Sequence, residues 1–505
     1  MKTEGMSQQL EALRRMNGKE WYALFMEQGT GKTWAYLADC ERYYAAGKID
    51  AIFVLAPNGV HTNWVLREIP AHLDCEHIAM AWRAGMGKRE RVKLEEALLT
   101  PTARGQLRPL RIFTMNFEAL LSKDAYDFAA KFMRSTRCMF IIDESQKIKN
   151  LQAATTKAVF KLKPLAVARR IGTGTPMDKP QDIFSQMEFL EEGLLGTSSF
   201  RAFMAEFAVL ADWQNPKRDA DWALKKQVKA NPRMAHAIIV ARDDDTGQPM
   251  YRNLDKLNKL IAEHSYRVLK KDCMDLPEKI YQSVYFDLTP KQRAAYDLME
   301  EQFRIELEDG SITPVSALAS LIKLQQITSG YVVVPGQEEL LYIGDKNPRI
   351  ERVTETVCDM QCKVIVWAKF REEVAALAAS LKKAGRNVVQ YHGDVKPKDR
   401  ELAIDSLQRG KADVFLGVQK AGGTGLTLTA AEWAVYCSNE HSSLLRQQSE
   451  DRNHRKGSST KHAVGYTDVV GRNTIDEAIT RAHQWKIALA ATVLGDRRLD
   501  LRSVL

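Results

Sequence analysis

Residues 26–33 read Met26-Glu27-Gln28-Gly29-Thr30-Gly31-Lys32-Thr33; they follow an apolar stretch and precede a helical pattern. A glycine-rich turn of this kind points backbone N–H groups inward and places a phosphate at the N-terminus of the next helix. The lysine would reach the outer phosphates of a nucleotide, and the threonine hydroxyl would be a ligand for Mg²⁺. Met26 stands where such loops usually have their first glycine. The stretch predicts a phosphate-binding loop.

A second segment of the same half supports this interpretation. The apolar run Met139–Ile142 ends in Asp143 and Glu144. A carboxylate at the C-terminal end of a parallel strand, next to a phosphate loop, can hold Mg²⁺. Its neighbour can orient and deprotonate an attacking water. An acidic cap on the following helix is the alternative interpretation.

The turn Gly172-Thr173-Gly174-Thr175-Pro176 follows the strand-like run Ala168–Ile171. Small hydroxyl residues in a tight turn suit the coupling of a γ-phosphate to a neighbouring surface. A plain turn is the alternative.

Near the other end of the chain stands Gln448-Ser449-Glu450-Asp451-Arg452-Asn453-His454-Arg455-Lys456-Gly457. On a helix, Gln448, Arg452 and Arg455 would share one face, because they are spaced by four and three residues. Guanidinium groups are rigid, permanently charged forks that suit a triphosphate. A nucleotide site divided between segments this far apart predicts two lobes that close on the nucleotide, as in a motor.

Short apolar runs alternate with helical patterns in both halves, which predicts an α/β fold with two parallel sheets. The expected strands are Ala51–Leu55, Arg111–Thr114, Cys138–Ile142, Ala168–Gly172, Lys363–Trp367, Asn387–Tyr391, Asp413–Val418, Trp433–Cys437 and Ala463–Val469. We interpret Trp21, Tyr22 and Phe25 as core residues at near-helical spacing. We place one lobe at 1–280, with a helical insertion at about 191–265, and the other at 281–505, with a helical insertion at about 289–345.

The composition limits the class of protein. With 505 residues, 45% of them hydrophobic, the chain can form two to four domains with real cores. The net charge of +9 is compatible with nucleic-acid binding without establishing it. The sequence shows neither a membrane-spanning run nor an apolar signal region at its start, so we expect a cytoplasmic protein with no membrane partner.

Together and in this order, the motifs resemble those of superfamily-two helicases, specifically the Swi/Snf-type branch of DNA translocases. The compact length is similar to the forms carried by bacteriophages and bacteria. The matching segments are MEQGTGKT at 26–33, VLAPNGVHTNW at 54–64, DESQKIKN at 143–150, GTGTP at 172–176, YHGD at 391–394, QKAGGTGLTLTAAE at 419–432, QSEDRNHRKG at 448–457 and, more weakly, TIDEAI at 474–479.

The resemblance implies two tandem RecA-like lobes, with helical insertions between and within them, and a site that uses ATP and Mg²⁺. Thr33 and Asp143 would hold the metal ion. The implied catalytic residues are Glu144 as base, Lys32, Gln448, and Arg452 and Arg455 as arginine fingers. The implied nucleotide contacts are Gln9 at the adenine, with Gln8 as a competing assignment, and Gly29, Thr30, Gly31, Lys32, Thr33 and Gly425.

The resemblance also implies sequence-independent contacts to the phosphates of duplex or forked DNA, made by loops at strand ends. The chain departs from the family pattern at Gln146, where the family usually has histidine, and at Asn439–Ser442, which replace a usual Trp-Asn-Pro stretch. The implied DNA contacts are Pro57, Asn58, Thr114, Asn116, Thr173, His392, Gly393, Lys420, Gly422 and Gly423.

Two other functions remain open. An RNA-dependent helicase would have the same ATPase motifs. The sequence does not separate it from a DNA translocase, because contacts to the 2′-hydroxyl leave no short sequence signature. A nucleic-acid-binding scaffold with a weak ATPase is the third hypothesis, and the intact Lys32, Asp143 and Glu144 argue against it. The short segment between Gly425 and Gln448 leaves little room for a strand-separating hairpin, which favours translocation, branch migration or protein displacement over unwinding. Replication or recombination proteins are candidate partners.

Overall fold

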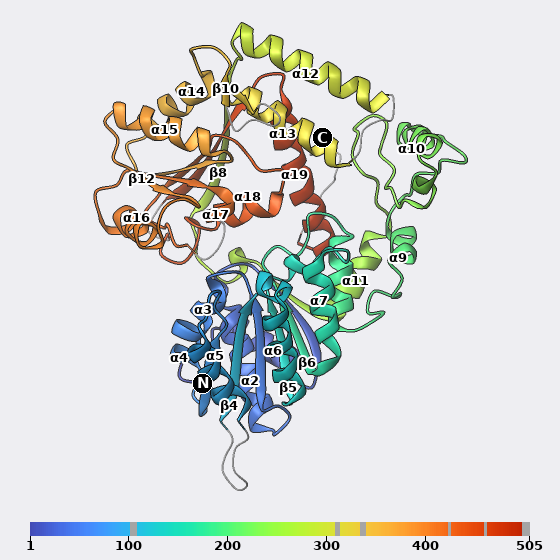
Figure 1. Ribbon diagram of the computed structural model, residues 1–505, viewed down its shortest axis with the longest axis vertical. Helices are drawn as coiled ribbons and strands as arrows, with labels where there is room; N and C mark the ends of the chain where they lie inside the picture. Colours follow the sequence, from blue (N-terminus) through green and yellow to red (C-terminus); the bar gives the residue numbers. More distant parts are fainter. Residues whose placement is uncertain (101–108, 309–313, 334–339, 423–425, 459–461, 497–505) are drawn as a thin grey trace. The chain divides into compact units, whose positions relative to one another are not determined.

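The computed structural model describes residues 1–100, 109–308, 314–333, 340–422, 426–458 and 462–496 (Figure 1). These residues form two compact units, each built around one parallel sheet. The predicted α/β class with two parallel sheets is confirmed. The first unit comprises Met1–Phe203, Asn253–Asp275 and residues 489–496, and the second comprises Met204–Arg252 and Leu276–Ala488.

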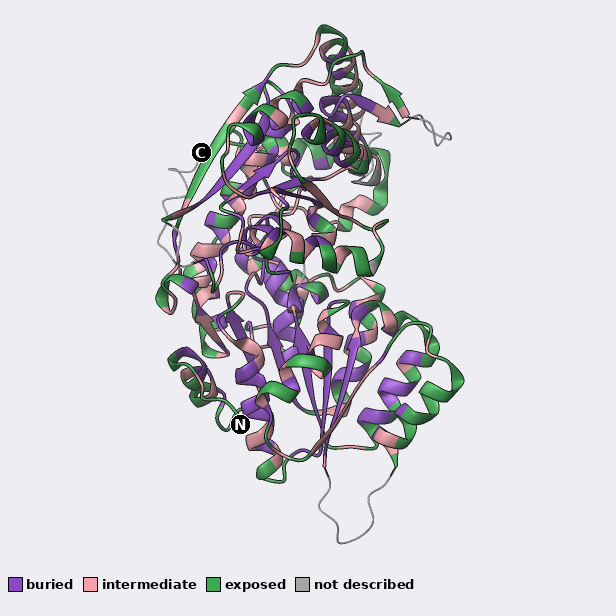
Figure 2. Ribbon diagram, turned by 90° about the vertical axis from the view of Figure 1, so that its left-hand side faces the viewer, coloured by how far each residue is buried: buried purple, intermediate pink, exposed green. Residues whose placement is uncertain are grey.

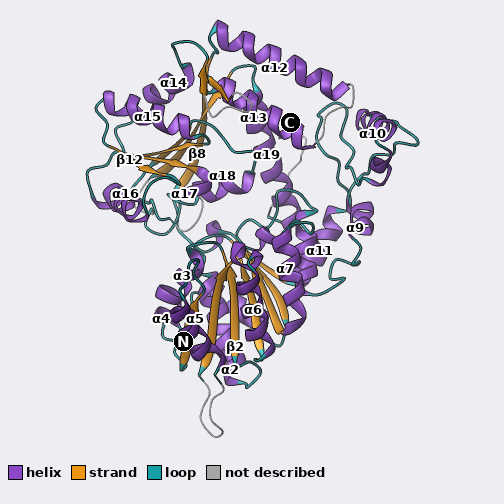
Figure 3. Ribbon diagram, in the orientation of Figure 1, coloured by secondary structure: helices purple, strands orange, loops and turns teal. Residues whose placement is uncertain are grey.

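The sheet of the first unit has seven strands in the order β3-β4-β2-β5-β6-β1-β7, and all neighbours are parallel. Helices lie on both of its faces (Figure 3). The strands are β1 Trp21–Met26, β2 Ala51–Ala56, β3 His77–Ala81, β4 Leu110–Asn116, β5 Cys138–Asp143, β6 Ala166–Gly172 and β7 Ser265–Val268. The helices are α1 Ser7–Met16, α2 Lys32–Ala45, α3 Val60–Asn63, α4 Ile69–His72, α5 Lys88–Leu99, α6 Lys123–Arg134, α7 Ala154–Leu162, α8 Asp182–Leu190 and α11 Leu254–Glu263.

Strand β2 shows why the central strands read as unbroken apolar runs. Its successive side chains point to opposite faces of the sheet, and both faces are covered. Ile52 and Val54 pack in the core cluster that includes α2. Phe53 stacks on Phe113 and Phe140 at centroid distances of 5.3 and 5.0 Å on the other face. Figure 2 shows the resulting burial of the central strands.

Strand β1 differs from its prediction. Trp21, Tyr22 and Phe25 were expected at near-helical spacing, but they lie in a strand between β6 and β7. Their expected place in the core holds for Tyr22 and Phe25, which are buried, while Trp21 is half-buried. The run shows no alternation because β1 is covered on both faces, so the periodicity carried no strand signal.

The sheet of the second unit has six parallel strands in the order β12-β13-β11-β14-β15-β8. The strands are β8 Glu278–Phe286, β11 Val364–Ala368, β12 Val388–Tyr391, β13 Val414–Val418, β14 Trp433–Tyr436 and β15 Ala463–Gly471, with a separate antiparallel pair, β9 Tyr331–Val333 and β10 Leu340–Tyr342. The helices are α10 Asp219–Ala230, α12 Pro290–Glu308, α13 Pro314–Thr328, α14 Pro348–Cys358, α15 Arg371–Lys383, α16 Pro397–Arg409, α17 Gln419–Gly422 and α18 Ser443–Glu450.

Two helices contribute residues to both units: α9 (Phe200–Phe207) and α19 (Ile475–Leu494). The insertion that we placed in the first lobe is divided, since Met204–Arg252 clusters with the second unit. One contact that ties it there is the stacking of Tyr251 on Trp485, at a centroid distance of 6.4 Å. Among the described residues, no helix combines the length and the apolar character that crossing a bilayer requires.

Candidate active site

The phosphate-binding loop connects β1 to α2, as the sequence predicts. Gly29 and Gly31 adopt left-handed backbone conformations, with φ of +87° and +94°. Only glycine takes up this conformation without strain, and it turns successive N–H groups toward one side of the loop. Helix α2 begins directly after Gly31, so the loop and the positive end of the helix dipole share one anion site.

The side chains of the loop are held by the loop's own carbonyl groups. Lys32 Nζ donates to the Met26 and Glu27 carbonyl oxygens at 2.7 and 3.4 Å. The buried Thr30 hydroxyl donates to the Glu27 carbonyl at 2.7 Å. Thr33 lies half-buried in the first turn of α2. A triphosphate would therefore compete with two carbonyl groups for the Lys32 ammonium.

Asp143 ends β5, next to this loop. Trp64 Nε1 donates to its Oδ2 at 3.1 Å. Burial and the neighbouring Glu144 raise the pKa of Asp143 from its ordinary 3.8 to about 6, although Lys32 and Trp64 act in the opposite direction. A buried carboxylate with an unfavourable charge is suited to a cation, and carboxylate and hydroxyl oxygens are the ligands that Mg²⁺ prefers. Asp143 and Thr33 therefore fit the metal that the sequence implies.

The raised pKa makes a prediction about stability. An unfolded aspartate ionises near 3.8, so the folded state holds the proton more tightly and loses stability as the pH rises from about 4 to about 6. A difference of about two pKa units corresponds to about 3 kcal/mol. We therefore expect Asp143→Asn to raise the free energy of unfolding at pH 7.5, by up to about 3 kcal/mol, in protein without nucleotide or metal.

Thermal unfolding of both proteins at pH 7.5 and pH 4 tests this. The advantage of the asparagine variant should disappear at pH 4, where the wild-type carboxyl is protonated. The raised pKa of Asp143 would be contradicted by an asparagine variant that is less stable than the wild type at pH 7.5. It would also be contradicted by a variant that is more stable than the wild type by the same margin at both pH values.

Glu144 follows Asp143 and has a left-handed backbone, with φ of 62° and ψ of 58°. A residue other than glycine pays strain energy in this region, and such residues cluster at functional sites. Its carboxylate accepts three hydrogen bonds: from Gln28 Nε2 at 3.3 Å, Gln146 Nε2 at 2.8 Å and Thr173 Oγ1 at 3.1 Å. The carboxylate is therefore held by Gln28 of the phosphate loop, by Gln146 of its own turn and by Thr173 of the turn after β6.

The turn after β6 completes this arrangement. Gly174 lies so close to the phosphate loop that a Cβ there would come within 2.9 Å of the Gln28 nitrogen and 3.1 Å of Glu27 Cα. Because both neighbours are backbone atoms, only glycine permits this approach. Thr173 is fully buried and its hydroxyl points to Glu144. The turn thus contacts the phosphate loop, with the Thr173 hydroxyl bound to Glu144, and the coupling role of the turn and the DNA contact of Thr173 stay predictions.

Both glutamines of α1 lie behind the loop. Gln9 Nε2 donates to the Gly31 carbonyl at 3.1 Å, and its Oε1 accepts from the Met6 N–H at 2.7 Å. Gln8 Nε2 donates to the Thr30 carbonyl at 3.3 Å. Both side chains therefore support the loop, and the adenine contact of Gln9 or Gln8 stays a prediction.

The arginine segment of the second unit differs from its prediction. Helix α18 ends at Glu450, so Gln448 is helical whereas Arg452 and Arg455 lie in the turns that follow. Beyond Glu450 the chain continues in turns, in which the Arg452 N–H donates to the Ser449 carbonyl at 3.2 Å and the Arg452 carbonyl accepts the Leu428 N–H at 2.8 Å. The two guanidinium groups nevertheless converge, since both donate through Nη1 to the Leu426 carbonyl, at 3.3 and 3.0 Å.

The predicted nucleic-acid contacts of the first unit fall into two groups. Asn58 is exposed, and Asn116 is half-buried and donates to Glu118 at 2.9 Å. Pro57 is buried. Thr114 is fully buried, and its hydroxyl donates to the His61 carbonyl at 2.8 Å. Its side chain is therefore not presented to a nucleic acid in this structure, because it ties β4 to α3.

In the second unit, Gly393 is exposed and His392 is half-buried beside Gln390. Lys420 is exposed on α17 and pairs with Glu440 at 3.1 Å. Gly422 ends α17. Gly423 and Gly425 lie outside the described residues, so their predicted contacts are not placed.

Sequence reasoning missed several partners of the site. It identified Asp143 and Glu144 but not Trp64 or Gln28, which bind their carboxylates across 79 and 116 residues of chain. Gln146 was noted only as a departure from the family pattern. A signal was present in each case, because Trp64 ends a matched motif and Gln28 lies inside the phosphate loop. The sequence does not show that the side chains of Trp64 and Gln28 point toward the carboxylates of Asp143 and Glu144.

Two family models match the chain. The SNF2-related domain model matches residues 13–330, and the helicase conserved C-terminal domain model matches residues 348–457. The chain is 23% identical to the TATA-binding protein-associated factor BTAF1 of Arabidopsis thaliana over 95% of its own length and 24% of that protein. It is also 23% identical to an uncharacterised ATP-dependent helicase of Mycoplasma genitalium, over 93% of its length and 40% of that protein.

The chain thus spans less than half the length of these curated relatives. Among solved structures, the SWI2/SNF2 ATPase core of Sulfolobus solfataricus in complex with dsDNA matches over 100% of this chain and 97% of that one, with 22% identity and a TM-score of 0.40.

Proposed function

Because the chain belongs to the family that carries the SNF2-related domain, we propose that it is an ATP-driven translocase that moves along duplex or branched DNA. The observation that carries the proposal is the contact of Glu144 with the phosphate loop through Gln28, beside Asp143 and Lys32. A base, a metal ligand and a phosphate-binding cation in one place are the parts that nucleotide hydrolysis needs.

Each part has a distinct role in the proposal. The loop N–H groups and Lys32 bind the phosphates of ATP, and Asp143 and Thr33 hold Mg²⁺. The metal ion, when bound, neutralises charge on the phosphate oxygens. Glu144 orients the attacking water and accepts its proton, and Gln28, Gln146 and Thr173 fix the direction of its carboxylate. Arg452 and Arg455 are the proposed arginine fingers, and Gln448 supports them.

The proposed track is the phosphate backbone of DNA. Exposed groups at strand ends, such as Asn58, Gly393 and Lys420, suit contacts that carry no sequence information. Such contacts do not distinguish DNA from RNA by themselves. The SNF2-type family favours DNA, and replication or recombination proteins are the partners that we expect for such a motor.

Translocation is favoured over strand separation by the segment before the arginines. Residues 426–458 are all described, and they contain strand β14, which is internal to the sheet, and helix α18. Within these residues there is no β-hairpin that could act as a separation pin. We therefore propose movement along intact duplex, branch migration or protein displacement.

Steady-state ATPase activity with different nucleic acids tests the function. We expect strong stimulation by duplex or forked DNA and little by RNA. Stimulation by RNA alone would move the protein to the RNA-dependent helicases. Equal activity in a Lys32→Ala variant would show that the phosphate loop is not the hydrolytic site. Opening of long blunt-ended duplexes by the pure protein would contradict the choice of translocation over unwinding.

A further inference from the structure

Arg267 connects the two backbone segments that frame the phosphate loop. It lies on β7, which pairs with β1. Its Nη1 donates to the Phe25 carbonyl at 3.2 Å and to the Gly174 carbonyl at 3.1 Å. Phe25 is in β1, one residue before Met26 opens the loop, and Gly174 is the glycine that touches the loop at Gln28. One guanidinium group therefore bridges the two segments beyond the point where the pairing of β1 with β6 ends.

The rest of the guanidinium binds a carboxylate near the C-terminal end of the chain. Arg267 Nε and Nη2 donate to Asp496 Oδ1 and Oδ2 at 3.0 and 2.7 Å. Both side chains are largely shielded, with 19% and 10% of their surfaces exposed. A two-point arginine–carboxylate pair in such a place is stronger and more directional than a surface ion pair. Asp496 lies outside both of the ranges that the family models match.

The end of α19 explains how Asp496 reaches this position. Gly495 is left-handed, with φ of +75°. The Asp496 N–H donates to the Ala491 carbonyl at 2.8 Å, and the Gly495 N–H donates to the Thr492 carbonyl at 3.2 Å. This is a glycine-terminated helix end, in which the chain turns sharply away from the helix axis. Asn258 Nδ2 donates to the Val493 carbonyl at 2.9 Å and holds the same end against α11.

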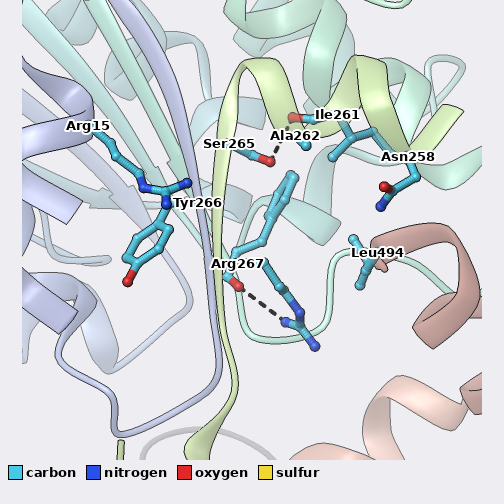
Figure 4. Close-up of a pocket in the computed structure, with 9 residues that line it drawn as sticks. Arg15, Asn258, Ile261, Ala262, Ser265, Tyr266, Arg267 and Leu494 are labelled. Atoms are coloured by element: carbon cyan, nitrogen blue, oxygen red, sulfur yellow. Dashed lines mark hydrogen bonds between the residues drawn. The ribbon is translucent and has the colours of Figure 1, made fainter. Parts of the chain in front are cut away.

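A cavity of about 180 Å³ lies beside Arg267. Figure 4 shows Asn258 and Leu494 on one side of it and Arg15 and Tyr266 on the other. Because Arg267 lines this cavity, its guanidinium has room to turn when its carboxylate partner is removed. The position of the fork therefore depends on Asp496 and not on packing alone.

We propose that Arg267 is a positioning residue of the nucleotide site and that Asp496 anchors it. With Asp496 in place, the carbonyls of Phe25 and Gly174 are held at a fixed separation, and the turn at Gly174 holds Gln28 and the phosphate loop. Without it, the fork turns toward the cavity and the loop loses its support. Through Arg267, the Asp496 carboxylate thereby sets the activity of the ATP site. This inference rests on the proposed ATPase function.

Steady-state ATPase kinetics of four variants test the proposal. Arg267→Met keeps the aliphatic stem and removes every donor, so we expect kcat to fall about 10- to 100-fold, as for a misplaced catalytic geometry. Arg267→Lys should not restore it, because an ammonium group cannot reproduce the fixed fork that bridges two carbonyls and a carboxylate. Asp496→Asn should lower kcat about fivefold. Asn258→Ala is the matched control, since it loosens the same helix end without touching the Phe25 or Gly174 carbonyl.

The double variant Arg267→Met with Asp496→Asn should be no worse than Arg267→Met alone, because the two residues act through one contact. Additive losses would overturn the proposal. So would an Arg267→Met variant whose kcat stays within about twofold of the wild type. The proposal would also be overturned if Asn258→Ala lowered kcat as much as Asp496→Asn does. The lower kcat would then follow from loosening of the helix end and not from loss of the Asp496 carboxylate.

Hydrogen–deuterium exchange separates this proposal from the proposed function, because it requires no turnover. Arg267→Met and Asp496→Asn should accelerate exchange in residues 24–33 and 172–178, and Asn258→Ala should not. Unchanged exchange in both segments would overturn the positioning role. If the wild-type protein hydrolysed no ATP while exchange changed as expected, the proposed function would fail and the structural coupling would stand.

Discussion

Glu144→Gln is expected to bind ATP as the wild type does and to hydrolyse it about 10²- to 10⁴-fold more slowly. The side chain keeps its size, and its amide oxygen can still accept some of the hydrogen bonds that Gln28, Gln146 and Thr173 donate to the carboxylate. An amide cannot take the proton of the attacking water, so the loss falls on kcat and not on binding.

The measurement is single-turnover hydrolysis together with equilibrium binding of a fluorescent ATP analogue. Glu95→Gln is the matched control, because it makes the same chemical change on an exposed glutamate of α5 in the same unit. The control should behave as the wild type does. Turnover of Glu144→Gln within about tenfold of the wild type would show that another group is the base.

Arg455→Ala is expected to retain ATP binding and to lose about 10³- to 10⁵-fold in turnover, as arginine fingers do elsewhere. Burial lowers the pKa of Arg455, and its Nη1 donates to the Leu426 carbonyl at 3.0 Å. A phosphate would stabilise this partly buried guanidinium more than the backbone carbonyl does, because a hydrogen bond between two opposite charges is stronger than one to a neutral acceptor.

Arg455 separates catalysis from folding better than Arg452 does. Arg452 is only 2% exposed and supports the segment through the Gln448 and Leu426 carbonyls, so its removal would also destabilise the second unit. Lys456→Ala is the matched control, because Lys456 is the exposed neighbour of Arg455. If Arg455→Ala kept turnover within about tenfold of the wild type, the finger assignment would be wrong.

The sequence predicted the central strands well because burial on both faces leaves a plain signal. β2 and β5 are unbroken apolar runs, and their predicted bounds agree with the structure within one residue. The edge strands β3 and β7 were missed, since they are short and contain polar residues. The helix expected through Arg455 ends at Glu450, and the turns that follow are held by a contact that no local pattern reveals, since the Arg452 carbonyl accepts the Leu428 N–H.

The site shows the same division between local and long-range information. The phosphate loop and the Asp143–Glu144 pair are local motifs, so the sequence identifies them directly. The Arg267–Asp496 pair joins residues 229 positions apart, and neither residue belongs to a motif of the nucleotide site. No periodicity or spacing could reveal it, because the contact exists only after the end of α19 has folded onto the first unit's sheet edge.

Displacement of a third strand from a DNA triplex tests the central claim most directly, since it reports movement along duplex DNA without strand separation. The account predicts ATP-dependent displacement by the wild type, at rates that fall with the length of duplex ahead of the triplex, and none by Glu144→Gln. Rapid ATP hydrolysis with no displacement on any duplex length would contradict a DNA translocase.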